Sequence, residues 1–565
     1  RLGCSNLAHA LAAQPDAARL IIKQGGSPHI AIISSYNDLL SAHAPYKDYP
    51  DQLKVVLAKA GATAQFAAGV PAMCDGITQG EAGMQLSLFS RDLIAQATAI
   101  GLTHGIFDGG LYLGICDKIV PGLLIGALHF GHLPAVFVPA GPMASGLANK
   151  DKAAVRERYV RGEASRDELL AAELAAYHQQ GTCTFYGTAN TNQLLLEAMG
   201  LHVPGSAFIH PHTPLRTALT AEAARLVARN SRQGERYLPL GVQIDARALV
   251  NAVVALLASA GSTNHSLHLP AMARAAGYEL IWEDFAALSA VVPLLARVYP
   301  NGAADVNQFQ AAGGPGWLIR ELLGAGLLHG DVPTVAGEGL AAYCREPWLE
   351  EGRLAWRDLP EQSPAEDIVR PAAAPFAQES GLQLLSGNLG RAMVKTSAVD
   401  PAYWQVRAPA RVFDSEAAVH QAYAAGLLQG DLVLVVRFQG PRANGMPELH
   451  KLMPLLVNLQ RNGQKVALLT DGRLSGASGK VLAALHLTPE AAAGGVLARV
   501  QEGDWISLDA LSGRMELEVS EAELATRQPA TSTEELAAGF GLSLFGAQRR
   551  LVGPADQGAT TLEWE

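Results

Sequence analysis

The sequence has 565 residues, of which 17% are charged and 49% hydrophobic, and 43 Lys and Arg against 53 Asp and Glu give a formal net charge of −10. Soluble proteins carry about 25% charged residues, so the chain is charge-poor, and its composition argues against intrinsic disorder. Its length predicts two large domains. The acidic balance argues against a nucleic-acid partner, and the strongest apolar runs fall short of the roughly 18 residues of a membrane-spanning helix.

The first part of the chain alternates strand-like and helical patterns. Residues 30–34 form a buried apolar run typical of a strand, and residues 86–100 repeat apolar side chains at three- and four-residue spacing, which predicts an amphipathic helix. Residues 111–115 and 135–138 are two more expected strands, with an expected helix at 119–130 between them. This order indicates a βαβ unit with parallel strands, and therefore an α/β fold.

A proline- and alanine-rich stretch at residues 358–380 is typical of an interdomain linker. Beyond it, residues 432–436 and 466–470 are expected strands, and Ser512-Gly513 lies between two strand-like runs, which predicts a hairpin. The pattern favours an N-terminal layered α/β region with parallel strands, followed by a β-rich C-terminal region. We expect two domains, at residues 1–370 and 380–565.

Polar side chains gather directly after several expected strands, where the active crevice of an open α/β sheet lies. Cys116, Asp117 and Lys118 follow the strand at 111–115. The other members of this group, in glycine-containing loops, are Cys74, Asp75, Cys183, Glu448, Arg473, Ser475 and Lys480. Thiolates and carboxylates are metal ligands. A cysteine that only packs in an apolar core does not need a charged residue next to it. The group therefore predicts a metal site.

The five cysteines are too few and too scattered for a disulfide scaffold, which favours a reducing cytoplasm. Cys4 and Cys344 lack an acidic neighbour, and we expect them to be packing residues, as free cysteines commonly are. The spacing of Cys74, Cys116 and Cys183 matches no zinc finger or ferredoxin. Two interpretations stay open: thiolates around an iron cluster with one iron as Lewis acid, and carboxylates around magnesium.

The segments that carry these side chains resemble the dihydroxy-acid and 6-phosphogluconate dehydratase family along essentially the whole chain. CDKIVPG, AGPM, GSTNHSLHL, GMPEL and TDGRLSG are similar to the wider family, and SYNDLLSAHAPY, GVPAMCDGITQGEAGMQLSLFSRD and GTCTFYGTANTNQ to its phosphogluconate branch. The resemblance implies a β-barrel-like C-terminal domain, an iron–sulfur cluster and a homodimer. It also implies an Entner–Doudoroff lyase that dehydrates 6-phospho-D-gluconate to 2-dehydro-3-deoxy-6-phosphogluconate.

The resemblance also implies the type of cluster. Cys116 and Cys183 match cluster ligands of the family. Members with a 2Fe–2S cluster carry a further cysteine near the first Asn-Asp-like turn, and the corresponding segment SYNDLLSAHAPY contains none. Our interpretation is that Cys74 is the third ligand and that the cofactor is a 4Fe–4S cluster with one open iron. The alternative is a 2Fe–2S cluster with Mg²⁺.

Further roles come from the same resemblance. Asp75, Asp117 and Glu448 match magnesium ligands of the 2Fe–2S members, and with a 4Fe–4S cluster Asp75 and Glu448 would serve the substrate or a proton relay. Lys118 matches a lysine that is carbamylated in the 2Fe–2S members. Ser475 matches the serine that acts as the catalytic base.

A phosphorylated substrate needs hydrogen-bond donors that bind its phosphate group. Arg442, Asn444, Ser478 and Lys480 lie in glycine-rich turns, where backbone amides also approach an anion, and are the expected donors. The rival interpretations are a dehydratase of another sugar acid or of a branched 2,3-dihydroxy acid, a mononuclear zinc hydrolase, and a non-catalytic iron or redox sensor.

Overall fold

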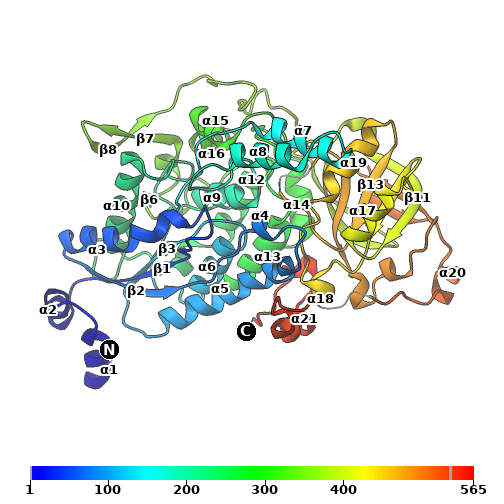
Figure 1. Cartoon of the computed structure of the whole chain (residues 1–565). Helices are drawn as coiled ribbons and strands as arrows, with labels where there is room; N and C mark the ends of the chain where they lie inside the picture. Colours follow the sequence, from blue (N-terminus) through cyan, green and yellow to red (C-terminus); the bar gives the residue numbers. More distant parts are fainter. Residues whose placement is uncertain (1–2, 477–478, 533–536, 565) are drawn as a thin grey trace.

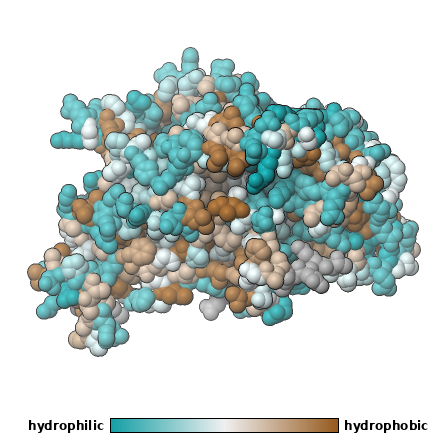
Figure 2. All heavy atoms as spheres, viewed as in Figure 1, coloured by the Kyte–Doolittle hydropathy of each residue, from teal (hydrophilic) through white to brown (hydrophobic). Residues whose placement is uncertain are grey.

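The computed structural model describes residues 3–476, 479–532 and 537–564. An N-terminal α/β part, blue to green in Figure 1, lies beside a C-terminal barrel drawn in yellow and orange. On the face seen in Figure 2, hydrophobic residues form small groups separated by hydrophilic ones. In the described part of the chain, no helix is long and apolar enough to span a membrane.

The N-terminal part is built on a parallel four-stranded sheet with the strand order β2-β1-β3-β4. Its strands are β1 (His29–Ser34), β2 (Thr63–Gly69), β3 (Gly109–Leu113) and β4 (Ala135–Val138). The predicted parallel α/β fold is thus confirmed. Because the strands are parallel, their carboxyl ends meet at one edge of the sheet, and the loops that follow them begin close together.

Helices cover both faces of this sheet, which explains why its central strands are apolar on both sides. Ile32 of β1 packs in one apolar cluster with α3 (Tyr49–Lys59) and α10 (Pro214–Arg229). The next residue, Ile33, points to the opposite face and packs in a second cluster with α5 (Ser87–Leu102) and α6 (Ile119–Leu128). The predicted amphipathic helix at 86–100 is therefore α5.

Many further helices complete the N-terminal part. They are α1 (Cys4–Ala12), α2 (Asp16–Gln24), α4 (Asp75–Thr78), α7 (Asn149–Val160), α8 (Arg166–Ala176), α9 (Thr188–Ala198), α11 (Leu240–Gln243), α12 (Ala246–Ala258), α13 (His265–Ala275), α14 (Trp282–Ser289), α15 (Val306–Ala311) and α16 (Gly314–Gly324). Two small antiparallel pairs follow them, β5 (Pro333–Thr334) with β6 (Gly337–Glu338) and β7 (Arg345–Glu350) with β8 (Arg353–Asp358).

The C-terminal part is a closed barrel with the strand order β10-β14-β13-β12-β11-β15-β16-β9. Its strands are β9 (Leu382–Gly387), β10 (Gly390–Lys395), β11 (Gln405–Phe413), β12 (Leu432–Val436), β13 (Val466–Thr470), β14 (Leu482–Thr488), β15 (Trp505–Asp509) and β16 (Arg514–Leu517). β11, β12, β13 and β14 are parallel neighbours, and β15 and β16 form the predicted hairpin. The loops after β12 and β13 therefore leave the barrel at the same rim.

The uninterrupted apolar sequence of β12 follows from burial on both sides of the barrel wall. Val433 and Val435 point into the barrel interior. Leu432, Leu434 and Val436 pack outward in a cluster that includes α17 (Glu416–Ala424) and α19 (Leu452–Arg461). The remaining helices of this part are α18 (Pro441–Asn444), α20 (Glu521–Thr526) and α21 (Gly546–Leu551).

The last residues of the chain leave the barrel and pack on the N-terminal part. Arg91 in α5 donates through Nη1 to the carbonyl oxygen of Gly558 at 2.8 Å and through Nη2 to that of Ala559 at 2.8 Å. The expected linker at 358–380 is largely irregular and also contacts the N-terminal part, since the Arg370 amide donates to the Leu295 carbonyl at 2.9 Å. The division at residues 370 and 380 stays a prediction.

Close packing of α5 on α6 depends on Gly122. A Cβ added there would lie 2.5 Å from the carbonyl oxygen of Arg91 and 2.8 Å from the Cβ of Ile94. We expect Gly122→Ala to lower the free energy of unfolding by about 1–3 kcal/mol, because one helix must shift. Gly324→Ala is the matched control, since a Cβ there meets nothing within 4 Å. Urea unfolding followed by circular dichroism tests the pair, and equal midpoints would contradict the prediction.

Candidate metal and catalytic site

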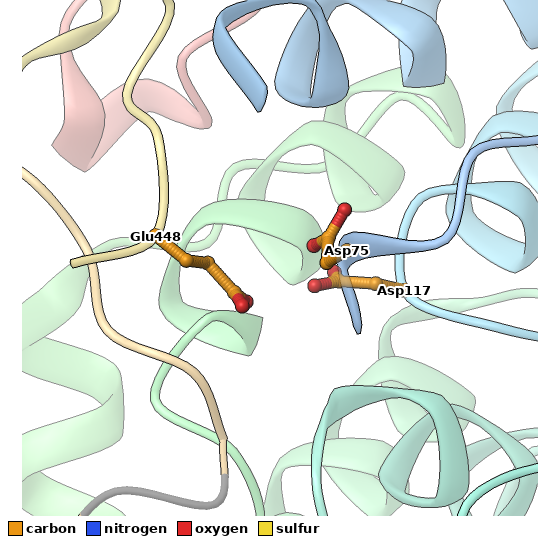
Figure 3. Close-up of side chains that lie close together, drawn as sticks. All are labelled: Asp75, Asp117 and Glu448. Atoms are coloured by element: carbon orange, nitrogen blue, oxygen red, sulfur yellow. The ribbon is translucent and has the colours of Figure 1, made fainter. Parts of the chain in front are cut away.

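Three carboxylates from three separate loops converge at the junction of the two parts (Figure 3). Asp75 opens α4 after β2, Asp117 follows β3, and Glu448 follows β12. Their ligand oxygens all lie within 4.8 Å of one another, and the carboxyl groups point toward one another in Figure 3. The carboxyl ends of parallel strands in both parts thus supply one site, as expected for Asp117 and Glu448 from their position after predicted strands.

Two buried cations hold this carboxylate set together. Lys118 Nζ pairs with Asp75 and lies 3.2 Å from Asp117 Oδ2. Arg473 Nη1 lies 2.8 Å from Glu448 Oε1 and 3.3 Å from Asp117 Oδ2, and its Nη2 lies 3.3 Å from Asp75 Oδ2. Three carboxylates therefore face two cations, which leaves one negative charge unbalanced when all three are ionised. A divalent cation fits this deficit, because hard cations such as Mg²⁺ prefer carboxylate oxygens.

The surroundings shift the pKa values of two of these carboxyl groups in opposite directions. Burial raises the pKa of Glu448 to about 7, although the charge of Arg473 opposes this rise. Burial acts on Asp117 in the same direction, but Lys118, His268 and Arg473 together hold the pKa of Asp117 well below its usual range. Near neutral pH, Asp117 is thus ionised, whereas Glu448 is present in both its protonated and its ionised form.

Neutral side chains fix the outer oxygens of the set. His268 Nε2 lies 2.8 Å from Asp117 Oδ1, and Gln79 Nε2 donates to Glu448 Oε2 at 3.0 Å. Asn264 Nδ2 donates to Glu448 Oε1 at 3.3 Å. These three residues are not among the predicted site residues. The signal for two of them was present, because Asn264 and His268 lie in the motif GSTNHSLHL.

Cys74, Cys116 and Cys183 line the same cavity as the carboxylates. Cys74 precedes α4, Cys116 follows β3, and Cys183 lies in the loop before α9. Burial raises the pKa of all three thiols, to about 12 for Cys183, and the other two thiols add to the rise at Cys116. Thiols with such pKa values ionise when a bound metal stabilises the thiolate. The three side chains are therefore better explained as ligands of a soft metal group than as cysteines that bind no metal.

Where the structure is described, only the three carboxylates bring their ligand atoms within 4.8 Å of one another. The thiols do not converge on one point in this way, which favours a larger metal group over a single zinc ion. Cys344 packs against the main hydrophobic core, as predicted. The same prediction for Cys4 is wrong, because Cys4 is exposed on α1, a helix that buries no residue.

The loop after β3 has an unusual backbone conformation at its thiol. Cys116 has φ of 76°, in the left-handed region that is uncommon for residues other than glycine. Asn192 of α9 holds this loop, because its Nδ2 donates to the carbonyl oxygens of Cys116 and Asp117 at 3.0 Å each. His265 Nε2 lies 2.9 Å from the Asn192 side-chain oxygen and fixes the amide in turn. The thiol and the adjacent carboxylate are therefore positioned together.

The thiols and carboxylates open into a cavity of about 610 Å³. Ser475 and Lys480, from the loop after β13, also line it. Of the expected phosphate donors within the described ranges, Arg442 and Asn444 are not among the lining residues, and Ser478 lies outside the described residues. The role expected for these three stays a prediction.

The glycine that follows Ser475 allows the loop of Ser475 to lie close against the N-terminal part. A Cβ added at Gly476 would lie 2.8 Å from Gly187 Cα, from Ser262 Oγ and from the Thr188 amide nitrogen. Only a glycine permits this close approach of the barrel loop to the start of α9. The loop brings Ser475, which is 7% exposed, to the shared cavity.

Comparison with known proteins gives full-length similarity. A dihydroxy-acid/6-phosphogluconate dehydratase N-terminal model matches residues 27–343, and the corresponding C-terminal model matches residues 367–559. A phosphogluconate dehydratase of Pseudomonas aeruginosa is 57% identical over 558 residues, which cover 99% of this chain and 92% of the relative. That of Escherichia coli K12 is 56% identical over 565 residues, covering 100% and 93%. A dihydroxy-acid dehydratase of Moorella thermoacetica is 34% identical over 510 residues, 89% of each chain.

Proposed function

Because the chain belongs to the dihydroxy-acid/6-phosphogluconate dehydratase family, we propose that it is a hydro-lyase that converts 6-phospho-D-gluconate to 2-dehydro-3-deoxy-6-phospho-D-gluconate. The observation that carries this proposal is the single cavity lined by the three thiols, the three carboxylates and Ser475. The relatives of higher identity are named phosphogluconate dehydratase, and the dihydroxy-acid dehydratase is less similar. This difference favours the phosphorylated sugar acid over a branched dihydroxy acid.

The residues present fit the metal groups that this chemistry requires. Cys74, Cys116 and Cys183 would hold a 4Fe–4S cluster, or a 2Fe–2S cluster if Mg²⁺ occupies the carboxylate set. When bound, the metal supplies a Lewis acid for the negative charge that develops on the departing carbon-3 hydroxyl. Iron and sulfide analysis of anaerobically purified protein, with electron paramagnetic resonance, distinguishes the two clusters.

The chain itself supplies the catalytic base and the positive charge near it. In its ionised form Ser475 takes the proton from carbon 2, and the carbon-3 hydroxyl leaves with the electron pair of the C–O bond. The proton held by Ser475 then passes to this departing hydroxide, which gives water and restores the ionised serine, and the resulting enol becomes the 2-keto acid. A serine hydroxyl is weakly acidic, so its ionised form needs positive charge nearby. Arg473 lies two residues before Ser475 in the same loop, and Lys118 fixes Asp75 and Asp117 through its two ion pairs.

Turnover measurements test the reaction directly. The cluster-loaded protein should dehydrate 6-phosphogluconate with a higher kcat/KM than it shows for gluconate or for a branched 2,3-dihydroxy acid. The 2-keto product can be followed by its absorbance after reaction with a carbonyl reagent. Faster turnover of either unphosphorylated acid would replace the proposed substrate, and an intact cluster without any turnover would favour a sensor.

Cation binding to the carboxylate set should depend on pH in a defined direction. We expect the affinity for Mg²⁺ to increase between about pH 6 and 8, because Glu448, with its pKa near 7, must lose a proton to bind a cation. Calorimetric titrations in two buffers with different ionisation enthalpies should show proton release near pH 6.5, a value chosen just below that pKa. Glu448→Gln should abolish this release.

Glu490→Gln is the matched control for this experiment. Burial also raises the pKa of Glu490 to about 7, but its side chain is not among those that line the cavity. The control should bind Mg²⁺ as the unmodified protein does. An affinity that is independent of pH, or equal proton release by both variants, would contradict a cation site at Glu448.

The remaining expectations concern assembly and location. We propose a cytoplasmic homodimer that acts in the Entner–Doudoroff pathway, on the basis of the family resemblance and the free cysteines. Light scattering of the purified protein measures its mass in solution, and a monomer at enzymatic concentrations would contradict the dimer.

A further inference from the structure

One face of α7 forms a wall of the cavity at the junction of the two parts. Asn149, Lys152 and Arg156 line the cavity at helical spacing. The same helix is bonded to α19 of the barrel part, because Asn458 Nδ2 donates to the carbonyl oxygen of Glu157 at 3.4 Å, and Figure 1 shows the two helices next to each other. The cations on this face are therefore held in fixed positions.

Lys152 is a buried cation in this wall. It is 3% exposed, its Nζ donates to the Tyr177 hydroxyl at 2.6 Å, and this atom lies 4.0 Å from the centroid of the Tyr177 ring. No carboxylate of the described residues comes within ion-pair distance of this ammonium group. Burial, with the charge of Arg156, lowers the pKa of Lys152 to about 8. An unbalanced buried charge is costly, so this position favours an anionic ligand.

Arg156 extends the cationic wall but is itself neutralised. Its Nε and Nη2 lie 2.5 Å and 2.9 Å from the two carboxylate oxygens of Glu173. Its Nη1 lies 3.0 Å from His450 Nε2, on the barrel side of the cavity. The unbalanced positive charge of this wall therefore comes from Lys152. Lys480, which is half-buried, contributes a second ammonium group to the lining.

We propose that Lys152 and Lys480, with Arg156 beside them, bind the terminal phosphate of the substrate; this inference rests on the proposed function. The carbon-2 and carbon-3 atoms have to reach the thiols, the carboxylates and Ser475, so a phosphate on carbon 6 needs a separate cationic position in the same cavity. A phosphate monoester carries about −1.5 to −2 charges at neutral pH, which two lysines balance. The lysines then account for a preference for the phosphorylated acid.

A different role for Lys152 predicts different behaviour. Burial raises the pKa of the Cys183 thiol, and the charge of Lys152 opposes this rise. Lys152 could thus serve to stabilise the thiolate of Cys183 and, through it, a bound cluster. In that case its removal would reduce the iron and sulfide content and would affect phosphorylated and unphosphorylated substrates equally.

The test compares Lys152→Met with Lys150→Met in the cluster-loaded enzyme. Lys150 lies on the same helix but is exposed and does not line the cavity, so Lys150→Met should behave as the unmodified enzyme. Lys152→Met should raise KM for 6-phosphogluconate about 10- to 100-fold, the usual effect of losing a hydrogen bond to a charged group. Its kcat and its KM for gluconate should change little, because the lost contact is to the phosphate.

Calorimetric titration with inorganic phosphate gives a second readout that does not depend on turnover. The unmodified enzyme and Lys150→Met should bind phosphate, and Lys152→Met should not. Lys480→Met should weaken phosphate binding in the same direction, and Lys152→Arg should restore part of it, which covers the case that Lys152→Met folds poorly.

Three results would overturn the proposal. These are unchanged phosphate binding in Lys152→Met, an equal loss of kcat/KM for both acids, and a loss of iron and sulfide in this variant. Each leaves the proposed function standing, because the unmodified enzyme would still dehydrate 6-phosphogluconate. Conversely, if the unmodified enzyme does not turn over that acid, the proposed function fails, and the phosphate titrations still decide whether the lysines bind an anion.

Discussion

Replacing Ser475 with alanine should lower kcat for 6-phosphogluconate by about 10²- to 10⁴-fold, the usual contribution of a positioned acid–base group. KM should change little, because the hydroxyl acts on the carbon-2 proton in the transition state and does not hold the substrate. The metal content should also stay constant, since serine is not among the thiols and carboxylates that would bind metal. Steady-state kinetics together with iron, sulfide and magnesium analysis measures all three quantities.

Ser41→Ala is the matched control for this variant. Ser41 also lines the cavity but lies at an exposed position, and its replacement should leave kcat within a few-fold of that of the unmodified enzyme. Near-normal turnover by Ser475→Ala would show that another group takes the carbon-2 proton. Loss of iron from Ser475→Ala would instead indicate that the serine supports the metal site.

The parallel strands β1, β3, β4, β12 and β13 could be predicted because their sequence patterns are local. The run at 432–436 is apolar at every position, since β12 is buried both inside the barrel and under α19, and such a run identifies a buried strand without further context. The order of the strands in the barrel could not be obtained in this way. β9 pairs with β16 across more than a hundred residues, and no local pattern specifies a partner at that distance.

Some residues of the candidate site could likewise be predicted from the sequence, and others could not. Asp117 and Glu448 could be found because each follows an expected strand, and the carboxyl ends of parallel strands lie together. Asp75 could be found because it follows a cysteine in a glycine-flanked turn. His268 and Lys152 were missed, since both lie within helices, where a polar side chain is equally typical of a solvated surface; only for His268 did a motif, GSTNHSLHL, give a signal. Only the tertiary structure shows that His268 contacts Asp117 and that Lys152 is buried in the cavity wall.

Replacing Arg473 with methionine should give the largest loss of stability in the chain outside the hydrophobic core. Arg473 is 1% exposed and pairs with all three carboxylates, so its removal leaves Lys118 as the only cation of the set among the residues described here. Removing one partner of a buried ion pair typically lowers the free energy of unfolding by about 3–5 kcal/mol. Urea unfolding of the metal-free protein measures this loss.

The loss should grow as the pH increases, and this dependence identifies its cause. Burial raises the pKa of Glu448 and Arg473 opposes this rise, so without Arg473 the pKa of Glu448 in the folded state is higher still. A raised pKa favours the folded protein at pH values below the unfolded pKa, and this contribution disappears as the pH rises through the folded pKa. Lys118 remains, so the destabilisation should be small near pH 5, where protonation removes the excess negative charge, and large near pH 8.

Two comparisons separate charge from packing. Arg407→Met removes an exposed ion pair with Glu518 on the barrel surface, with Arg407 59% exposed, and should leave the midpoint of unfolding nearly unchanged, because water and salt screen exposed ion pairs. Added Mg²⁺ should recover part of the stability of Arg473→Met, because a divalent cation supplies the missing positive charge to the carboxylates. Equal destabilisation at both pH values, without recovery by Mg²⁺, would instead assign the role of Arg473 to its hydrogen bond from Nε to the Met446 carbonyl at 2.8 Å.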